Sequence, residues 1–293
     1  MTDIAAGLAL LAAVLFAVGT VAQQRSAATV PDDTARGLGL IRVLMHRRQW
    51  WLGVIGDGGG YVAQAAALAF GSLLLVQPLL VTTLLFALPL GARWAGRTLG
   101  RADWVWAAVL AVALAVFVVT GEPTDGLSSA DFGTWLPTMI VLGALLGAGL
   151  VAVSRSRGTV RAALLAGCAA LCFGVAAAMT KGVVGEFDAG LVAVLTSWET
   201  YALIVVAVAG TLLQQSAFQA GALGASLPTM IVGEPIVAVA IGVTVLEEEL
   251  RSDGAELALI GLLGIVMVVA TVALARSSAR STPPVSPVGV HDG

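Results

Sequence analysis

Long apolar runs alternate with short polar segments along most of this chain. Nine runs have about the length that crosses a ~30 Å hydrocarbon layer as a helix. They cover residues 4–22, 50–70, 72–93, 103–120, 134–153, 161–181, 198–219, 223–245 and 255–275. The pattern predicts an all-α polytopic membrane protein with nine transmembrane helices. The first run has no basic segment before it, so we interpret it as a membrane helix rather than a signal peptide.

Composition excludes an ordinary soluble protein. Of the 293 residues, 58% are hydrophobic and 11% are charged, whereas soluble domains carry about 25% charged residues. The sequence has no basic tract of the kind that nucleic-acid binding needs. Histidine occurs only at His46 and His291, and no zinc-hydrolase, serine-hydrolase or phosphate-loop motif is found. We therefore expect no enzyme, no cofactor and no nucleic-acid partner.

Basic residues in the connecting segments predict the orientation in the membrane. With the N-terminus outside and the C-terminus inside, the cytoplasmic segments hold 13 of the 15 basic residues, five of them in the polar loop 23–49. The outside segments hold only Lys181 and Arg251. Abundant arginine, a single lysine and no asparagine are typical of a GC-rich bacterium. We therefore expect a multi-pass protein of the bacterial cytoplasmic membrane.

Two parts of the chain resemble each other. A shift of 150 positions places Gln64 on Gln214 and Pro78 on Pro228, without a gap. The first helix resembles the sixth at a shift of 157 positions. Because five helices separate equivalent elements, the two copies enter the membrane from opposite sides. The sequence predicts an inverted repeat, a common transporter plan with a site where the halves meet.

The predicted boundaries follow from this repeat. Residues 1–153 form a first repeat of five transmembrane helices, and residues 154–275 form a second, inverted repeat of four. The second repeat stops one helix short of five. Residues 276–293 are rich in proline and serine, and we expect a disordered cytoplasmic tail.

Polar side chains inside hydrocarbon are costly and usually face a cavity or a partner. Asp57, Tyr61 and Gln64 share one face of the second helix. Glu234 lies about eleven residues into the eighth helix, beside Pro235, which removes one backbone donor. Asp57 and Glu234 are the candidate metal ligands. The structural alternatives are an acid hydrated from the helix end and a protonated glutamate that packs against a kink.

Further polar and proline residues complete the predicted site. Glutamine offers donors and an acceptor without charge, which suits either substrate contact or interhelical bonding. The candidate substrate contacts of this type are Gln77, Gln214 and Gln215, and the candidate hinges are Pro78, Pro228 and Pro235. Lys181 and Glu199 lie near the predicted outer interface, where long side chains can reach water.

The pattern of helices, repeats and polar positions resembles that of the drug/metabolite transporter (DMT, EamA-like) superfamily. The resemblance rests on paired helix starts, LFAVG at Leu15 and LCFGV at Leu171, and on a doubled spacing of glycine and proline. Trp50-Trp51-x-Gly53, Ala66-Ala67-x-Ala69-Phe70 and Leu75-Val76-Gln77-Pro78-Leu79 are closer to the NIPA-type magnesium-transporter branch. Members of that branch typically carry an acid and an amide in the second helix. Here Gln64 takes the amide position, Tyr61 takes the acidic position, and the nearest acid is Asp57.

Three functions are consistent with these observations. The first is a secondary transporter that moves a small solute by alternating access, as the resemblance implies. The second is a transporter of Mg²⁺, an ion that prefers oxygen ligands. The third is a non-transporting membrane scaffold of an envelope assembly complex. The expected partners are a small-molecule or ion substrate and the lipid bilayer. The oligomeric state stays open, with a homodimer as one option.

Overall fold

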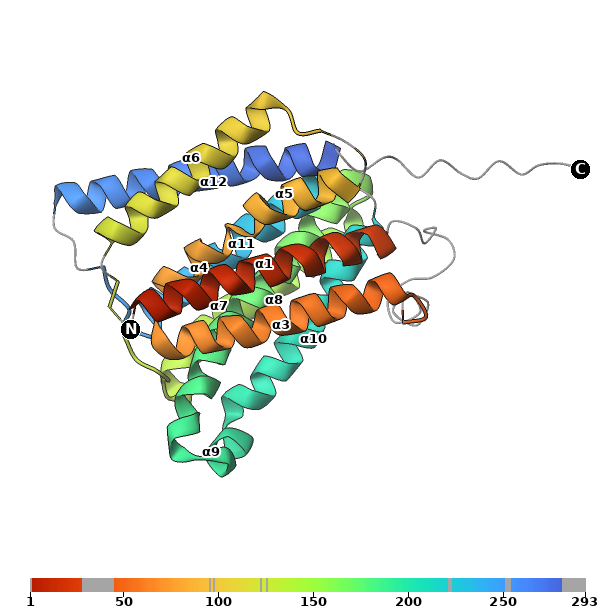
Figure 1. Cartoon of the computed structure of the whole chain (residues 1–293). Helices are drawn as coiled ribbons and strands as arrows, with labels where there is room; N and C mark the ends of the chain where they lie inside the picture. The colour runs from red at the N-terminus through yellow and green to blue at the C-terminus, as the bar shows by residue number, and fades with distance from the viewer. Residues whose placement is uncertain are drawn as a thin grey trace, which may run out of the picture.

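The computed structural model describes residues 2–27, 45–94, 96, 98–121, 123–124, 126–220, 223–250 and 254–280, and these are almost entirely helical (Figure 1). The elements are α1 (Thr2–Ala27), α3 (Arg48–Phe70), α4 (Leu73–Leu80), α5 (Thr83–Trp94), α6 (Arg101–Thr120), α7 (Phe132–Arg155), α8 (Gly158–Gly185), a 3-10 turn (Glu186–Ala189), α9 (Leu191–Thr196), α10 (Trp198–Gln219), α11 (Leu223–Thr244) and α12 (Ala255–Arg280).

Eight segments among the described residues are long and apolar enough to cross a membrane. This confirms the prediction of an all-α, multi-pass membrane protein. The predicted span 50–70 is the one that does not reach this standard, although its residues form the 23-residue helix α3. Five glycines and Asp57 lower the hydropathy of α3. The number of nine spans therefore stays a prediction.

The predicted span 72–93 is a broken helix. Two short helices, α4 and α5, are joined at residues 81 and 82, where the backbone makes tighter bonds such as Thr82 N to the Leu79 carbonyl at 3.0 Å. The Thr82 hydroxyl donates to the same carbonyl at 2.6 Å. Such local bonding by threonine competes with the regular helical pattern. The first short helix contains Pro78, and the second contains Pro89.

Helix α8 lies at the centre of the bundle. It packs against α10 and α11 and, less extensively, against α7 and α3 (Figure 1). By contrast, the membrane-spanning part of α7 is exposed along most of its surface. Gly143 and Gly147 of α7 have no atoms near the position where a Cβ would stand. This exposed face is available to lipid or to another chain.

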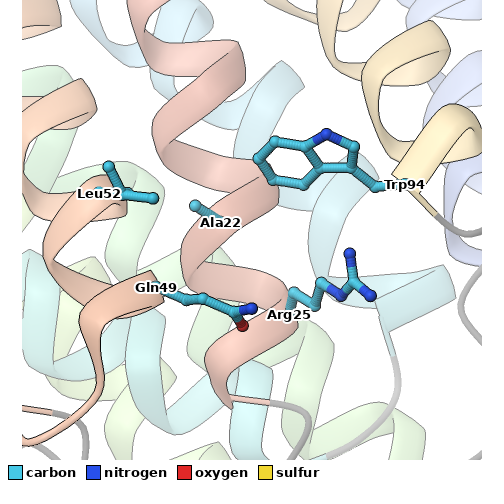
Figure 2. Close-up of a pocket in the computed structure, with 5 residues that line it drawn as sticks. All are labelled: Ala22, Arg25, Gln49, Leu52 and Trp94. Carbon is cyan, nitrogen blue, oxygen red and sulfur yellow. The ribbon is translucent and has the colours of Figure 1, made fainter.

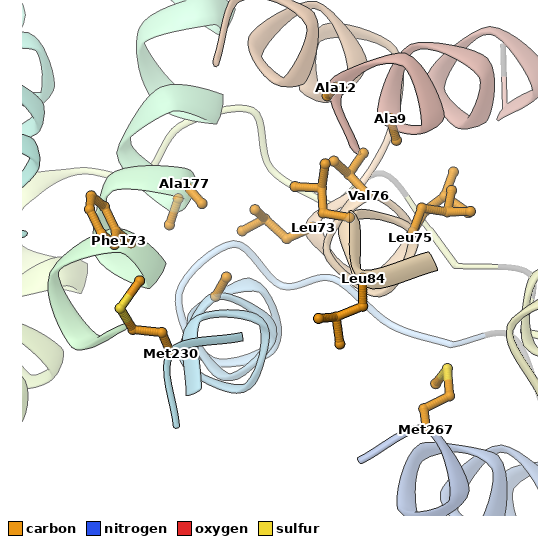
Figure 3. Packing of buried hydrophobic residues seen from close by; sticks show 14 of the residues in the cluster. Ala9, Ala12, Leu73, Leu75, Val76, Leu84, Phe173, Ala177, Met230 and Met267 are labelled. Carbon is orange, nitrogen blue, oxygen red and sulfur yellow. The ribbon is translucent and has the colours of Figure 1, made fainter. Parts of the chain in front are cut away.

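A continuous apolar core joins the first and the second half of the chain. Ala9 of α1, Val76 of α4, Phe173 of α8 and Met230 of α11 all belong to one cluster of buried side chains (Figure 3). Alanine is frequent where α1 and α8 are buried, which lets neighbouring helices approach closely.

The two ends of the bundle can be recognised from contacts. At the end that we call the Glu248 end, Glu248 after α11 binds the first residues of α4, and Gly182 near the end of α8 packs on Glu199 at the start of α10. At the opposite end, the Gln23 end, Gln23 near the end of α1 packs on Gly53 near the start of α3. Helices α1 and α8 therefore run in opposite directions, and so do α3 and α10.

The end of the chain differs in part from the predicted tail. Helix α12 continues to Arg280, five residues into the stretch 276–293 that was expected to be disordered. Residues 281–293 and most of the polar loop 23–49 lie outside the described residues.

Candidate functional site

Asp57 lies at a very close crossing of α3 and α1. Gly56 of α3 faces the backbone of Gly19, and a Cβ added to Gly19 would overlap the Asp57 carboxylate. A Cβ at Gly53 would likewise overlap the side chain of Gln23. The glycines therefore serve close packing, and the small residues bring the carboxylate of α3 directly onto the backbone of α1.

Three polar side chains from three helices form a chain of hydrogen bonds. The Gln23 amide Nε2 donates to Asp57 Oδ2 at 2.5 Å. The Gln215 amide Nε2 of α10 donates to Gln23 Oε1 at 2.8 Å. Gln23 and Gln215 are buried, at 7% and 4% exposure. These hydrogen bonds connect the first half of the sequence to the second. We call Asp57, Gln23 and Gln215 the Gln23 cluster.

The Gln23 cluster has acceptor capacity that the protein does not use. Asp57 Oδ1 and Gln215 Oε1 are buried without a hydrogen-bond partner among the described residues. Gln64 lies seven residues further along α3, on the same face as Asp57, and its Oε1 is also buried and unpartnered. An unsatisfied buried polar atom typically costs about 1–3 kcal/mol. A bound cation, a donor group or an ordered water would remove that cost.

Tyr61 and Glu234 lie near the Gln23 cluster. Glu234 is close enough to act electrostatically on both Asp57 and Tyr61, and Asp57 also acts on Tyr61. Glu234 is partly buried on α11, and its backbone carbonyl packs against Gly174 of α8. Tyr61 is 44% exposed and contacts Phe16 edge to face, with the ring centroids 5.0 Å apart. The two carboxylates singled out in the sequence therefore belong to one region of the molecule.

The remaining predicted residues are more dispersed. Gln77 is fully buried on α4, and neither its amide nitrogen nor its amide oxygen has a hydrogen-bond partner among the described residues. Gln214 is half-buried, whereas its neighbour Gln215 points inward. Pro78 lies in α4 just before the break, while α11 continues as a helix through both Pro228 and Pro235. Of the three candidate hinges, Pro78 alone is near an interruption of the described helices.

A buried ion pair at the Glu248 end was not predicted from the sequence. Lys181 of α8 and Glu248 are joined at 2.5 Å, with their side chains 6% and 0% exposed. Glu248 also accepts the backbone N–H groups of Leu73 at 2.8 Å and Leu74 at 3.0 Å, at the start of α4. A helix N-terminus is a favourable place for a carboxylate. The expectation that Lys181 reaches water is therefore wrong, because a buried carboxylate compensates its charge.

Glu199 also departs from the expectation that it reaches water. Its side chain is 5% exposed, and its carboxylate accepts a hydrogen bond from the Ser197 hydroxyl at 2.5 Å.

Two features of the sequence pointed to a buried partner for Lys181: it is the only lysine of the chain, and it lies in an apolar helix. Gln23 carried no such signal, because it lies at a predicted helix end where glutamine is common.

The described residues contain no group of three or more histidine, cysteine, aspartate or glutamate side chains that could hold a metal ion. Cys168 and Cys172 are free and buried in α8. Protein oxygens for a cation in the Gln23 cluster therefore come from one or two carboxylates and from amides. This set suits a cation that keeps part of its hydration shell.

Comparison with known proteins identified one close relative in sequence. An uncharacterized protein of Corynebacterium glutamicum is 38% identical over 272 residues, which cover 92% of this chain and 94% of the relative. No family model matches the chain. No solved structure matches it either.

Proposed function

We propose a transport function for this chain, which belongs to the same protein family as the relative from Corynebacterium glutamicum. It is a secondary transporter of the drug/metabolite type, built as an inverted repeat, and it moves a small solute by alternating access. The observation that carries the proposal is the Gln23 cluster, in which Asp57 of the first half is linked through Gln23 to Gln215 of the second half. Unpartnered acceptors at such a junction suit a substrate site.

A repeated packing contact supports the internal repeat. In the first half, a Cβ at Gly60 of α3 would lie 2.7 Å from the Phe16 ring of α1. In the second half, a Cβ at Gly210 of α10 would lie 3.0 Å from the Phe173 ring of α8. The two glycines are 150 positions apart and the two phenylalanines are 157 apart, the same shifts that relate the sequences of these helices. The opposite directions of equivalent helices favour an inverted relation.

The arginines favour an orientation with the Gln23 end in the cytoplasm. Described arginines follow or precede the helix ends at this side of the bundle, namely Arg25, Arg47, Arg48, Arg93, Arg101, Arg155, Arg157, Arg161 and Arg276. Lys181 at the opposite end is neutralised by Glu248. Under the positive-inside rule, the N-terminus and the Glu248 end face outside, and α3 is the ninth membrane span.

The proposed mechanism uses the two ends in turn. One half of the molecule tilts against the other, so that the Gln23 cluster is open first to one side and then to the other. Opening between the halves at the Gln23 end breaks the neutral hydrogen bond from Gln215 to Gln23. Asp57 then presents its carboxylate to a substrate that carries a positive charge or several hydrogen-bond donors. The Gln64 amide lies on the same face of α3 and offers a second contact.

A direct test uses purified protein in vesicles. The expected result is uptake, or dissipation of a pH gradient, when a metabolite extract is added, and its loss in Asp57→Asn. Asp103→Asn is the matched control, because Asp103 accepts the Gly100 N–H in the exposed first turn of α6 and the asparagine amide oxygen can accept the same bond. Equal activity of the Asp57→Asn variant and the wild-type protein would contradict the proposal.

Mg²⁺ is a second candidate substrate. It is favoured because the carboxylates of Asp57 and Glu234 lie in one region, close enough for Glu234 to act electrostatically on Asp57. An Mg²⁺-sensitive dye inside the same vesicles tests it, and no Mg²⁺ entry removes this candidate. The scaffold hypothesis predicts a different result. It requires that Asp57→Asn and Glu234→Gln leave cellular function intact while changes in the loops abolish it.

A further inference from the structure

A small open cavity lies on the surface of the first half at the Gln23 end. It has a volume of about 200 Å³ and is lined by Ala22, Arg25, Gln49, Leu52 and Trp94 (Figure 2). Its residues come from the last turns of α1, the first turns of α3 and the last residue of α5. The cavity is therefore at the level of helix ends, where a membrane protein meets lipid headgroups.

The surface of the cavity is almost entirely apolar, and the polar ends of Arg25 and Gln49 stand at its rim. Ala22 forms a buried floor at 2% exposure, and Leu52 and the ring of Trp94 remain exposed, at 57% and 39%. The Arg25 guanidinium extends from α1, the helix that also carries Ala22, and the Gln49 amide extends from α3 (Figure 2). Tryptophan at this depth is typical of the membrane–water interface. An apolar floor with polar groups beside it matches a molecule that has both a headgroup and a hydrocarbon part.

The charge at the cavity is not compensated by described residues. Arg25 is exposed and makes no ion pair with any side chain in the described part of the chain. None of the five lining residues is acidic, and Arg48 and Arg93 are sequence neighbours of lining residues. Arginine offers several N–H donors that match a phosphate. The ligand that complements this surface is an anion with an apolar portion.

We propose that this site binds an anionic phospholipid, with the phosphate at the rim on Arg25 and Gln49 and the start of an acyl chain inside the cavity against Ala22, Leu52 and Trp94. A volume of about 200 Å³ equals roughly seven water molecules, so the cavity accepts only the first part of one acyl chain and not a whole lipid. Basic pockets on the cytoplasmic side of membrane proteins are suited to the headgroups of such lipids.

The position of the cavity gives the lipid a role. Ala22 precedes Gln23 in α1, and Leu52 precedes Gly53, the residue on which the Gln23 side chain packs. A bound lipid therefore braces α1, α3 and α5 together beside the residue that links Asp57 to Gln215. We expect occupancy to stabilise the arrangement of the Gln23 cluster.

Lipid binding can be measured without any transport assay. The full chain in detergent is titrated with dioleoyl phosphatidylglycerol or dioleoyl phosphatidylcholine and followed by native mass spectrometry and thermal unfolding. Phosphatidylglycerol is expected to bind and to raise the unfolding temperature. Arg25→Gln should weaken this binding about fivefold, the factor that one basic residue contributes near an anionic surface.

Two variants and one soluble ligand make the test specific. Arg25→Lys keeps the charge and should keep most of the binding, and Arg155→Gln removes an exposed arginine from α7 at the same end and should leave binding unchanged. Equal losses in Arg25→Gln and Arg155→Gln, or equal binding of both lipids, would overturn the proposal. Stabilisation by inorganic phosphate alone would show that the ligand is a soluble anion and would overturn it as well.

Discussion

The two ends of the bundle are fastened in different ways. At the Glu248 end, a buried carboxylate has every partner it needs: the Lys181 ammonium and two backbone N–H groups at the start of α4. At the Gln23 end, the Gln23 cluster joins the halves through a neutral amide bond of 2.8 Å, and acceptors of this cluster have no partner among the described residues. Removing one partner of a buried ion pair typically costs about 3–5 kcal/mol, whereas one neutral hydrogen bond contributes about 0.5–1.5 kcal/mol.

The loops strengthen this difference. Thr124 N donates to the Glu249 carbonyl at 2.8 Å, and Leu127 N donates to the Leu246 carbonyl at 2.6 Å. Glu247 has φ of 54°, the only positive value among described residues other than glycine, and it directly precedes the buried Glu248. Such strain persists where surrounding contacts hold it in place. The described contacts at the Glu248 end are thus charged and fully paired, whereas those of the Gln23 cluster are not, and the transport proposal therefore predicts that the Gln23 end opens at lower cost.

The largest expected effect comes from breaking the ion pair. Lys181→Met leaves the Glu248 carboxylate buried without its cation, so the free energy of unfolding should fall by about 3–5 kcal/mol. Thermal or chemical unfolding in detergent measures it. The double variant Lys181→Met with Glu248→Gln should recover part of this loss, and no recovery would mean that the pair acts through something other than charge compensation.

The next effect concerns the close crossing at the Gln23 end. Gly19→Ala places a methyl group where the Asp57 carboxylate lies, so the hydrogen bond to Gln23 should be disturbed. We expect a loss of about 1–3 kcal/mol in stability together with loss of transport. The matched control is Gly7→Ala in the same helix, where nothing lies within 4 Å of the added Cβ. Similar effects of both substitutions would show that the crossing is not as close as described.

A smaller effect is expected from the amide link itself. Gln215→Leu removes the donor to Gln23 Oε1 and should cost about 1 kcal/mol while favouring opening at the Gln23 end. Hydrogen–deuterium exchange of the backbone amides around Gln215 in α10 should then be faster than in the wild-type protein. Gln214→Leu, at the half-buried neighbour, should leave the rate unchanged. An unchanged rate in Gln215→Leu would show that the bond from Gln215 to Gln23 does not control opening at the Gln23 end.

The smallest effect belongs to a surface cap. The Thr134 hydroxyl and the Gly133 N–H donate to the Asp131 carboxylate and hold the pKa of Asp131 below its usual value. Its contribution to stability is therefore present above the unfolded-state pKa and is lost as the pH falls through the lower, folded-state pKa. Asp131→Asn keeps a capping oxygen and should remove this slight acid dependence, measured as the unfolding temperature between neutral and acidic pH.

Prediction from sequence succeeded for features that depend only on the order of residues along the chain. Apolar runs of membrane length located the helices, and Asp57 and Glu234 stood out as acids in such runs. Pro78 was predicted as a hinge and lies just before the break between α4 and α5. The break itself is at residues 81 and 82, where the Thr82 hydroxyl bonds to its own backbone, and the sequence did not specify that position. The burial of Glu248 was not foreseen either, because a run of three glutamates in a loop normally meets water.

The sequence by itself determined an all-helical membrane protein, because burying backbone polar groups in lipid leaves helices as the available solution for long apolar runs. It also determined which polar residues are costly enough to need an explanation. Only the tertiary structure decided their partners: Gln23 with Asp57 and Gln215, and Lys181 with Glu248. These contacts join residues 34 to 192 positions apart, and no local pattern specifies which side chains packing brings together.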